Sequence, residues 1–375
     1  TRNKKTTKWL RLKKYLPKSS KLFTSIAFKL TTDEKSKKDI IKPIEGQVSI
    51  FFPAEKENSN LKFHIHAPFA STVARDSIKD LPENKDLLDQ ITRLLNESLI
   101  YFKEEKILDF NLIRALPIED DNLSPFYLPI LNNVIQAFNN QELVKTDSGK
   151  FKPGYLCYRA SVRTKKVIDI ETLKIFEGNE DNDNIYWIKN PPQLNQREDK
   201  FLQALNIKTF TDDYFISNIN DTLCPYSWDS KLSKEKLISF LETKDNQWLK
   251  SFYELLYDIL KDGDFDDDYS ALIKLDNGQF NSDNDPVFFK SEFDVASDSF
   301  NYVEPDVYSY DKKVKIEKAK EFLIELGVKA VDDKDEIQSL LENQENADSI
   351  TYDENLKFIE RFIKYFNETK DAEIF

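Results

Sequence analysis

Residues 44–78 read IEGQVSIFFPAEKENSNLKFHIHAPFASTVARDSI and decide the fold of the first part of the chain. The segments 47–52 and 61–67 are rich in β-branched and aromatic residues, which is typical of strands. A polar run, 55–60, separates them, so we predict two neighbouring strands joined by a loop. A further loop carries Arg75 before a long helical pattern. This order places one guanidinium at the end of a sheet, where it suits contact with an anion.

Two more segments near the N-terminus have strand patterns. Residues 8–12 alternate polar and apolar side chains, and residues 22–28 are rich in aromatic and β-branched side chains. From Asp86 to Phe102 apolar residues recur at helical spacing, which predicts an amphipathic helix that packs on the sheet. The sequence therefore predicts an α/β (α+β) fold that starts with a mixed sheet packed by helices. The acidic residues 119–121 mark the end of this part.

Three sequence features beyond that point occur twice. They are an aromatic pair that opens a helix, a D-x-G-x-F turn that leads into a strand, and the end of a later helix. Their offsets are 126, 129 and 121 residues. The first copy is represented by Phe126, Asp147 and Phe201, and the second by Phe252, Asp276 and Phe322. Offsets this similar indicate a duplicated module, so we predict two tandem α/β repeat modules.

We predict four regions. They are a first α/β domain at 1–118, a first repeat module at 119–246, a second at 247–354, and the start of a third at 355–375. The chain contains no methionine, not even at position 1. We therefore expect it to be an internal piece of a longer protein.

The first domain resembles a known family through a short ordered motif. A Glu-Gly-Gln sequence precedes a strand ending in Phe-Pro, and a polar loop, a second strand and an Arg-Asp pair follow. The residues are Glu45, Gly46, Gln47, Phe52, Pro53, Arg75 and Asp76. This order resembles the middle segment of the ninety-kilodalton heat-shock chaperones and of sacsin-like proteins, which are ATPases of the GHKL superfamily.

The resemblance implies a role for Arg75. In that family the arginine before the acid contacts the γ-phosphate of ATP held by a separate N-terminal domain. Arg75 is thus implied to be the catalytic residue, with Asp76 orienting its turn. ATP and Mg are implied as cofactors of the full-length protein, with none bound within this chain. The sequence departs from the family at Thr72 and Ala74, where the chaperones carry asparagine and serine, and at 64–66, where they have a more basic strand.

Two functions follow from these patterns. In the first, the chain is a region of a chaperone-like ATPase that couples the ATP state of an upstream domain to the binding of protein clients or partner subunits. In the second, the modules form a non-enzymatic scaffold and Arg75 is a surface arginine, with Asp76 adding favourable charge to the first turn of the helix. Sequence upstream of Thr1 would discriminate between them.

Charge and composition limit the partners. There are 67 acidic against 54 basic residues, a net charge of −13, which argues against nucleic acid as the main partner. Residues 1–21 nevertheless hold nine Lys or Arg and no acid. No apolar run reaches membrane-spanning length, so no membrane partner is expected. Two distant cysteines, Cys157 and Cys224, suit a reducing cytoplasm.

Several catalytic and metal sites are not supported. None of the seven glycines forms a G-x-G motif, so we expect the isolated chain not to bind ATP tightly. His64 and His66 share one face of a strand, but no cysteine lies near them to complete a metal site. The alternating aspartates at 181–183 and 264–268 lack the glycine of a calcium loop and are expected to be solvated. We expect Trp187, Trp228 and Trp248 to be packing residues rather than part of a peptide groove.

Overall fold

The computed structural model describes residues 7–17, 19–178, 184–223, 233–260, 267–281, 286–290, 300–311 and 314–331, with a few isolated positions from 356 to 367. The contacts within the chain divide it into two compact units. Unit 1 is Thr1–Val162 with Asn182–Phe210, and unit 2 is Arg163–Asp181 with Thr211–Phe375. The predicted domain limits at 118, 246 and 354 stay predictions.

A six-stranded mixed sheet forms the N-terminal part of unit 1, as the sequence predicts. Its strands are β1 (Lys8–Tyr15), β2 (Phe23–Thr32), β3 (Asp39–Lys42), β4 (Gln47–Ser49), β5 (Pro53–Asn58) and β6 (His64–His66). The order is β1-β2-β6-β4-β5, and β3 also pairs with β2. Only the β4–β6 pair is parallel. The two predicted strands of the decisive stretch are therefore direct neighbours.

Two details of this sheet differ from the prediction. The polar run 55–60, expected as a loop, largely belongs to β5, an edge strand that pairs antiparallel with β4. Charged side chains are typical of an exposed edge strand, because they discourage pairing with another chain. Strand β3 was not anticipated from the sequence. It has only four residues, of which Ile41 alone is buried.

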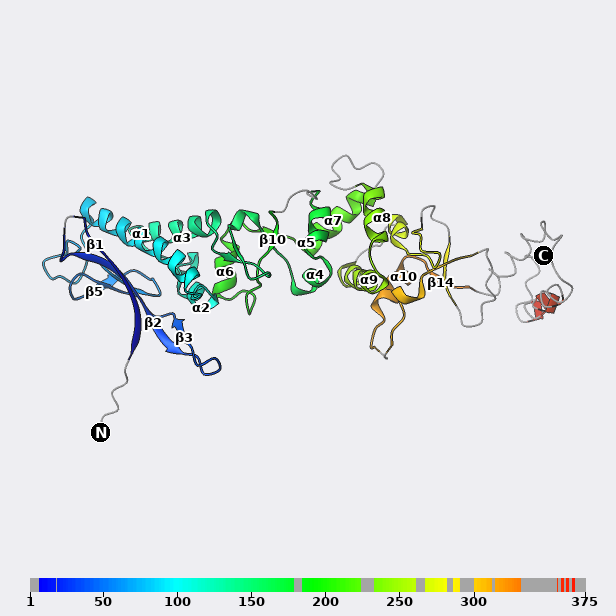
Figure 1. The fold of residues 1–375 in the computed structure, drawn as a ribbon, viewed down its shortest axis with the longest axis horizontal. Coiled ribbons are helices and arrows are strands. Elements are labelled where there is room, and N and C mark those ends of the chain that lie inside the picture. Colours follow the sequence, from blue (N-terminus) through cyan, green and yellow to red (C-terminus); the bar gives the residue numbers. More distant parts are fainter. Residues whose placement is uncertain are drawn as a thin grey trace, which may run out of the picture. The chain divides into compact units, whose positions relative to one another are not determined.

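Helices cover one face of the sheet (Figure 1). Helix α1 (Pro82–Glu104) packs on β1 and β2, and α3 (Leu128–Asn140) lies beside α1. The ring of Phe102 on α1 meets Phe28 of β2 edge to face, with 5.6 Å between centroids. Helix α1 begins four residues before Asp86, because Pro82 is well suited to the first helical turn. Asp109 then caps a separate short helix, α2 (Phe110–Ala115).

The first repeat module begins with α3 and continues with a small hairpin and a three-stranded parallel sheet. The hairpin strands are β7 (Val144–Lys145) and β8 (Phe151–Lys152). The sheet has the order β10-β9-β11, formed by β9 (Cys157–Arg159), β10 (Tyr186–Trp187) and β11 (Lys208–Thr209). The 3-10 helix η1 (Glu119–Asp121) precedes α3, and the remaining elements of the module in unit 1 are η2 (Gly154–Leu156) and α6 (Arg197–Gln203).

Unit 2 contains the second module together with four helices from the range predicted for the first. These four are α4 (Val162–Val167), which begins at the last residue of unit 1, α5 (Ile170–Phe176), α7 (Asp212–Leu223) and α8 (Lys234–Glu242). The helices of the second module are α9 (Asn246–Leu260), α10 (Lys318–Glu325) and the 3-10 helices η3 (Asp267–Leu272) and η4 (Pro305–Val307). Its parallel sheet has the order β13-β12-β14, formed by β12 (Val287–Phe289), β13 (Asn301–Tyr302) and β14 (Lys329–Ala330).

The two modules repeat the same hydrogen-bond frame. In the first, the amide of Asp147 donates to Trp187 at 3.0 Å, and in the second Asp276 donates to Tyr302 at 2.8 Å. Gly149 and Gly278 occupy the same position in the turn, with φ of 80° and 87°. The prediction of two tandem α/β modules is confirmed.

One of the three predicted correspondences between the modules is wrong. Phe126 lies in the turn before α3, whereas Phe252 lies within α9, so the two are not equivalent. The other two features do correspond, because Phe201 and Phe322 both lie on the helix that precedes the last strand of the module. Phe-Tyr pairs are common on buried helix faces, and such a pair alone does not fix the helical register.

Candidate functional site

Arg75 lies near the tip of a closed loop between β6 and α1. The base of the loop is an isolated antiparallel bridge between Ser71 and Ile78. Inside it the amide of Thr72 donates to the carbonyl of Ser77 at 3.1 Å, and the amide of Arg75 donates to the carbonyl of Thr72 at 3.0 Å. The loop is therefore defined by its own backbone hydrogen bonds. Arg75 therefore lies on a loop, as predicted from the sequence.

The backbone of Arg75 is in the left-handed region, with φ of 60°. A residue with a Cβ atom meets steric repulsion there, at a cost of about 1–2 kcal/mol relative to the right-handed region. Residues held in such conformations cluster at functional sites, so the observed φ motivates a functional hypothesis for this position.

Asn84 fixes the base of the loop. It is fully buried in the first turn of α1. Its Oδ1 accepts the amide of Ala70 at 2.8 Å, and its Nδ2 donates to the carbonyls of Ala70 and Lys79, also at 2.8 Å. The side chain of Asn84 therefore forms hydrogen bonds with the backbone at both ends of the loop. Sequence reasoning missed Asn84, because an asparagine in a first turn carries no pattern that indicates its tertiary partners.

Asp76 organises the far side of the loop. Its carboxylate accepts a hydrogen bond from Thr72 Oγ1 at 3.0 Å and pairs with Lys56 Nζ at 2.6 Å. The hydrogen bond from Lys56, followed by that from Thr72, holds the pKa of Asp76 below its usual value of 3.8. The expected place of Asp76 in the first turn of a helix is wrong. Helix α1 begins only at Pro82, and Asp76 bonds within the loop and to β5 instead.

The guanidinium of Arg75 is exposed and lies 5.7 Å from the ring centroid of Phe52. Asp76, the nearest acid in sequence, pairs with Lys56 instead. Among the residues that the structure describes, no carboxylate forms an ion pair with Arg75. A cation held on a ring, without an acidic partner, can accept an incoming anion without first breaking a salt bridge.

A second anchor joins the loop to the body of the domain. Glu57 of β5 accepts the amide of Ile78 at 2.9 Å through Oε2 and the hydroxyl of Tyr127 at 2.8 Å through Oε1. Burial, and then the carboxylate of Glu57, raise the pKa of Tyr127 well above its usual value of 10.0. Tyr127 therefore stays a neutral hydrogen-bond donor.

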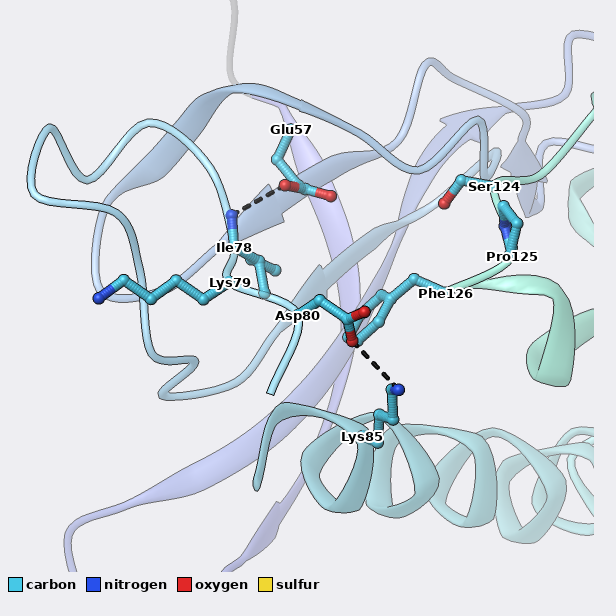
Figure 2. A pocket seen from close by; sticks show the side chains of 8 residues that line it. All are labelled: Glu57, Ile78, Lys79, Asp80, Lys85, Ser124, Pro125 and Phe126. Atoms are coloured by element: carbon cyan, nitrogen blue, oxygen red, sulfur yellow. Dashed lines mark hydrogen bonds and ion pairs between the residues drawn. The ribbon is translucent and has the colours of Figure 1, made fainter. Parts of the chain in front are cut away.

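A pocket of about 310 Å³ lies next to this anchor (Figure 2). It is lined by Glu57, Ile78, Lys79, Asp80, Lys85, Ser124, Pro125 and Phe126. Figure 2 shows Asp80 and Lys85 facing one another, with 3.1 Å between Oδ1 and Nζ. The pocket adjoins the chain that leaves the Arg75 loop. It mixes two cations with two carboxylates, so its charge favours neither anions nor cations.

The Glu-Gly-Gln sequence has a structural reason at Gly46. Its amide donates to the carbonyl of Leu61 at 2.7 Å. A Cβ at this position would come within 2.5 Å of the carbonyl oxygens of Leu61 and Phe63. Only glycine allows this close approach of the two chains.

The two histidines of β6 take part in packing. His64 Nδ1 accepts the amide of Gln47 at 2.8 Å, and its ring stacks on Trp9 with 4.7 Å between centroids. His66 lies 4.8 Å from the ring of Phe23. Burial lowers the pKa of both imidazoles below 6.5. Over the described residues no group of three metal-ligating side chains occurs. The aspartates predicted to be solvated, 181–183 and 264–266, lie outside the described residues, as does the side chain of Asp268.

The remaining candidates are also packing residues where they are described. Trp187 is buried, and Trp248 stacks on Phe252 while its Nε1 donates to the carbonyl of Val167 at 3.1 Å. Cys157 is buried, which raises the pKa of its thiol to about 12. Trp228 and Cys224 lie outside the described residues. Among the described helices, none is both long and apolar enough to cross a membrane.

Comparison of the chain with protein-family models, with curated proteins and with solved structures found no match.

Proposed function

We propose that this chain is a region of a chaperone-like ATPase of the GHKL superfamily. In this proposal it couples the ATP state of an upstream nucleotide-binding domain to the binding of protein clients or partner subunits. Arg75 acts in trans on the γ-phosphate of ATP, and Mg and ATP are bound by the upstream domain. The cytoplasm is the proposed location, in keeping with two cysteines far apart in the sequence.

One observation carries the proposal, namely an exposed arginine on an anchored loop. Asn84 and Glu57 tie the loop to α1 and β5, and Asp76 is occupied by Lys56. Arg75 is left with an aromatic neighbour and no acid among the described residues. If a loop is already ordered before its partner binds, the free-energy cost of ordering it on binding is smaller.

The chemistry that suits Arg75 is stabilisation of a transferring phosphoryl group. A planar guanidinium presents a rigid fork of N–H donors that matches two phosphate oxygens, whereas an ammonium is a point charge with three rotatable donors on one nitrogen. An arginine that meets the γ-phosphate mainly after domain closure stabilises the transition state more than the bound substrate, and so raises kcat.

A non-enzymatic scaffold is the second candidate. The repeated hydrogen-bond frame of the two modules favours it, because repeat arrays commonly serve as binding surfaces. In this case Arg75 is a surface residue.

The test compares Arg75→Ala with Arg93→Ala, an exposed arginine on α1, in the protein that carries the nucleotide-binding domain. We expect Arg75→Ala to lower ATP turnover roughly a hundredfold and to leave nucleotide affinity nearly unchanged. Arg75→Lys should recover only part of the rate. Turnover that is equal in both alanine variants would favour the scaffold, and a loss confined to affinity would make Arg75 a ground-state ligand.

A further inference from the structure

The face of the N-terminal sheet that α1 does not cover carries aromatic and basic side chains. Alternate residues of a strand point to opposite faces. Leu10 and Leu12 of β1 pack against the core, and Lys14 pairs with Glu97 of α1 at 2.5 Å. The odd-numbered residues of β1 therefore point the other way. We call this surface the aromatic-basic face; it comprises Trp9, Arg11, Lys13, Tyr15, Phe23 and the two histidines of β6.

Rings and cations alternate on this face and hold one another in place. The guanidinium of Arg11 lies 5.0 Å from the centroid of Phe23, and its Nε donates to Ser25 Oγ at 3.2 Å. Lys13 Nζ lies 5.0 Å from the centroid of Tyr15. Trp9 is 40% and Tyr15 is 50% exposed. The face is thus ordered while much of its aromatic surface remains in contact with water.

The face is positively charged, although the whole chain has a net charge of −13. Strands β1, β2 and β6 contain no aspartate or glutamate. Arg11 and Lys13 are joined on the same side by Lys29, which pairs with Trp9 in register. His64 and His66 add little charge at neutral pH, because their pKa values are lowered by burial. An anionic polymer is therefore attracted to this face and repelled by the rest of the chain.

We propose that the aromatic-basic face binds single-stranded nucleic acid. Single strands are typically bound by aromatic side chains that stack on bases and by cations that contact the phosphates. A sheet surface with exposed rings is one arrangement that provides both contacts. A duplex has its bases stacked and paired, so it cannot use the rings. The site is local and does not involve Arg75, so this proposal can fail or succeed independently of the proposed ATPase function.

The test is fluorescence anisotropy of a labelled 15-nucleotide oligo-dT with the 375-residue chain, at several salt concentrations. The competing probes are the same sequence as a duplex, polyphosphate and a polyglutamate peptide. We expect oligo-dT to bind most tightly and to quench Trp9. Trp9→Ala should weaken binding about tenfold, the loss of one stacked base. Lys13→Gln should reduce the slope of log K against log salt by about 0.7.

Two matched controls keep the result specific to this face. Lys14→Gln removes the neighbouring cation on the opposite face, and Tyr101→Ala removes a ring on α1 that is 40% exposed. Both should leave oligo-dT affinity within twofold. Trp9→Phe should restore most of the affinity lost in Trp9→Ala, which separates stacking from misfolding.

Three outcomes would overturn the proposal. The first is equal binding of polyphosphate and oligo-dT with no effect of Trp9→Ala, which would indicate attraction of any polyanion. The second is tighter binding of polyglutamate, which would point to an acidic protein partner. The third is the absence of saturable oligo-dT binding at the lowest salt concentration.

Discussion

Arg197 of α6 donates two hydrogen bonds to the carboxylate of Asp121, at 2.6 and 2.5 Å, across 76 residues of sequence. The same guanidinium donates to the carbonyls of Arg114 and Leu116, both at 2.6 Å. The side chain of Asp121 is only 3% exposed. This pair joins the segment after α2 to the helix that closes the first module, both within unit 1.

The first prediction concerns this pair. Asp121→Asn removes the counter-charge of Arg197, whose side chain is 21% exposed, so we expect unit 1 to lose about 1.5–3 kcal/mol of stability. The neighbouring pair, Asp120 with Lys200, is about half exposed on both sides. Asp120→Asn is therefore the matched control and should cost less than about 1 kcal/mol. Urea unfolding of both variants measures the difference, and equal midpoints would contradict the prediction.

The second prediction concerns Asn84. Asn84→Asp keeps the acceptor for the amide of Ala70 but places a carboxylate oxygen against two carbonyl oxygens. We expect faster hydrogen exchange at the amides of Ala70 and Lys79 at neutral pH. Lower pH should restore part of the protection, because a protonated carboxyl can donate one hydrogen bond again. Gln90→Glu, a partly exposed amide on the same helix, serves as the control. Unchanged exchange in Asn84→Asp would show that the loop does not depend on this anchor.

The third prediction is a pH dependence at the Arg75 loop. The pKa of Asp76 is lowered in the folded state, chiefly by its hydrogen bond with Lys56. A lowered pKa adds stability above the unfolded-state value of about 3.8 and loses it as pH falls through the folded-state pKa. NMR titration of Asp76 should show this low midpoint. Lys56→Gln should raise the titration midpoint of Asp76 toward the usual value. High salt should also raise this midpoint, because it screens the charge of Lys56.

The fourth prediction separates two kinds of glycine. Gly46→Asn should destabilise unit 1 by about 1–3 kcal/mol or more, because any Cβ collides with backbone oxygens of Leu61 and Phe63. Gly149→Asn should cost only a few tenths of a kcal/mol, since asparagine tolerates a positive φ and nothing lies within 4 Å of the new Cβ. Thermal melts of the two variants test this contrast. A loss at Gly46 as small as that at Gly149 would mean that the surrounding backbone moves to admit the new Cβ, because the φ of Gly46 is not in the left-handed region.

Sequence patterns predicted the parts of the fold that depend on repeated local features. The alternation in β1 and the helical spacing in α1 reflect side chains that face the same environment at regular intervals, and the D-x-G-x-F turns reflect a glycine with positive φ. Strand β5 was missed because an edge strand exposed to water has the composition of a loop.

The candidate site was predictable only at Arg75 itself. Its anchors are single side chains that bond backbone atoms brought near by the fold. Asn84 follows Lys79 by five residues, but Glu57 lies 70 residues from Tyr127. No spacing in the sequence encodes such contacts. Asp76 lies in the loop and not in the first turn of a helix, and its partner Lys56 comes from the strand that was expected to be a loop.

The positive φ of Arg75 has an evolutionary consequence. Glycine adopts this backbone conformation without steric cost, so Arg75→Gly removes the steric repulsion at this position. Stability alone would therefore select glycine at this position over arginine. A lineage that keeps arginine here accepts a less stable loop in return for the guanidinium. Without continued selection on its activity, substitutions that increase stability would replace the side chain.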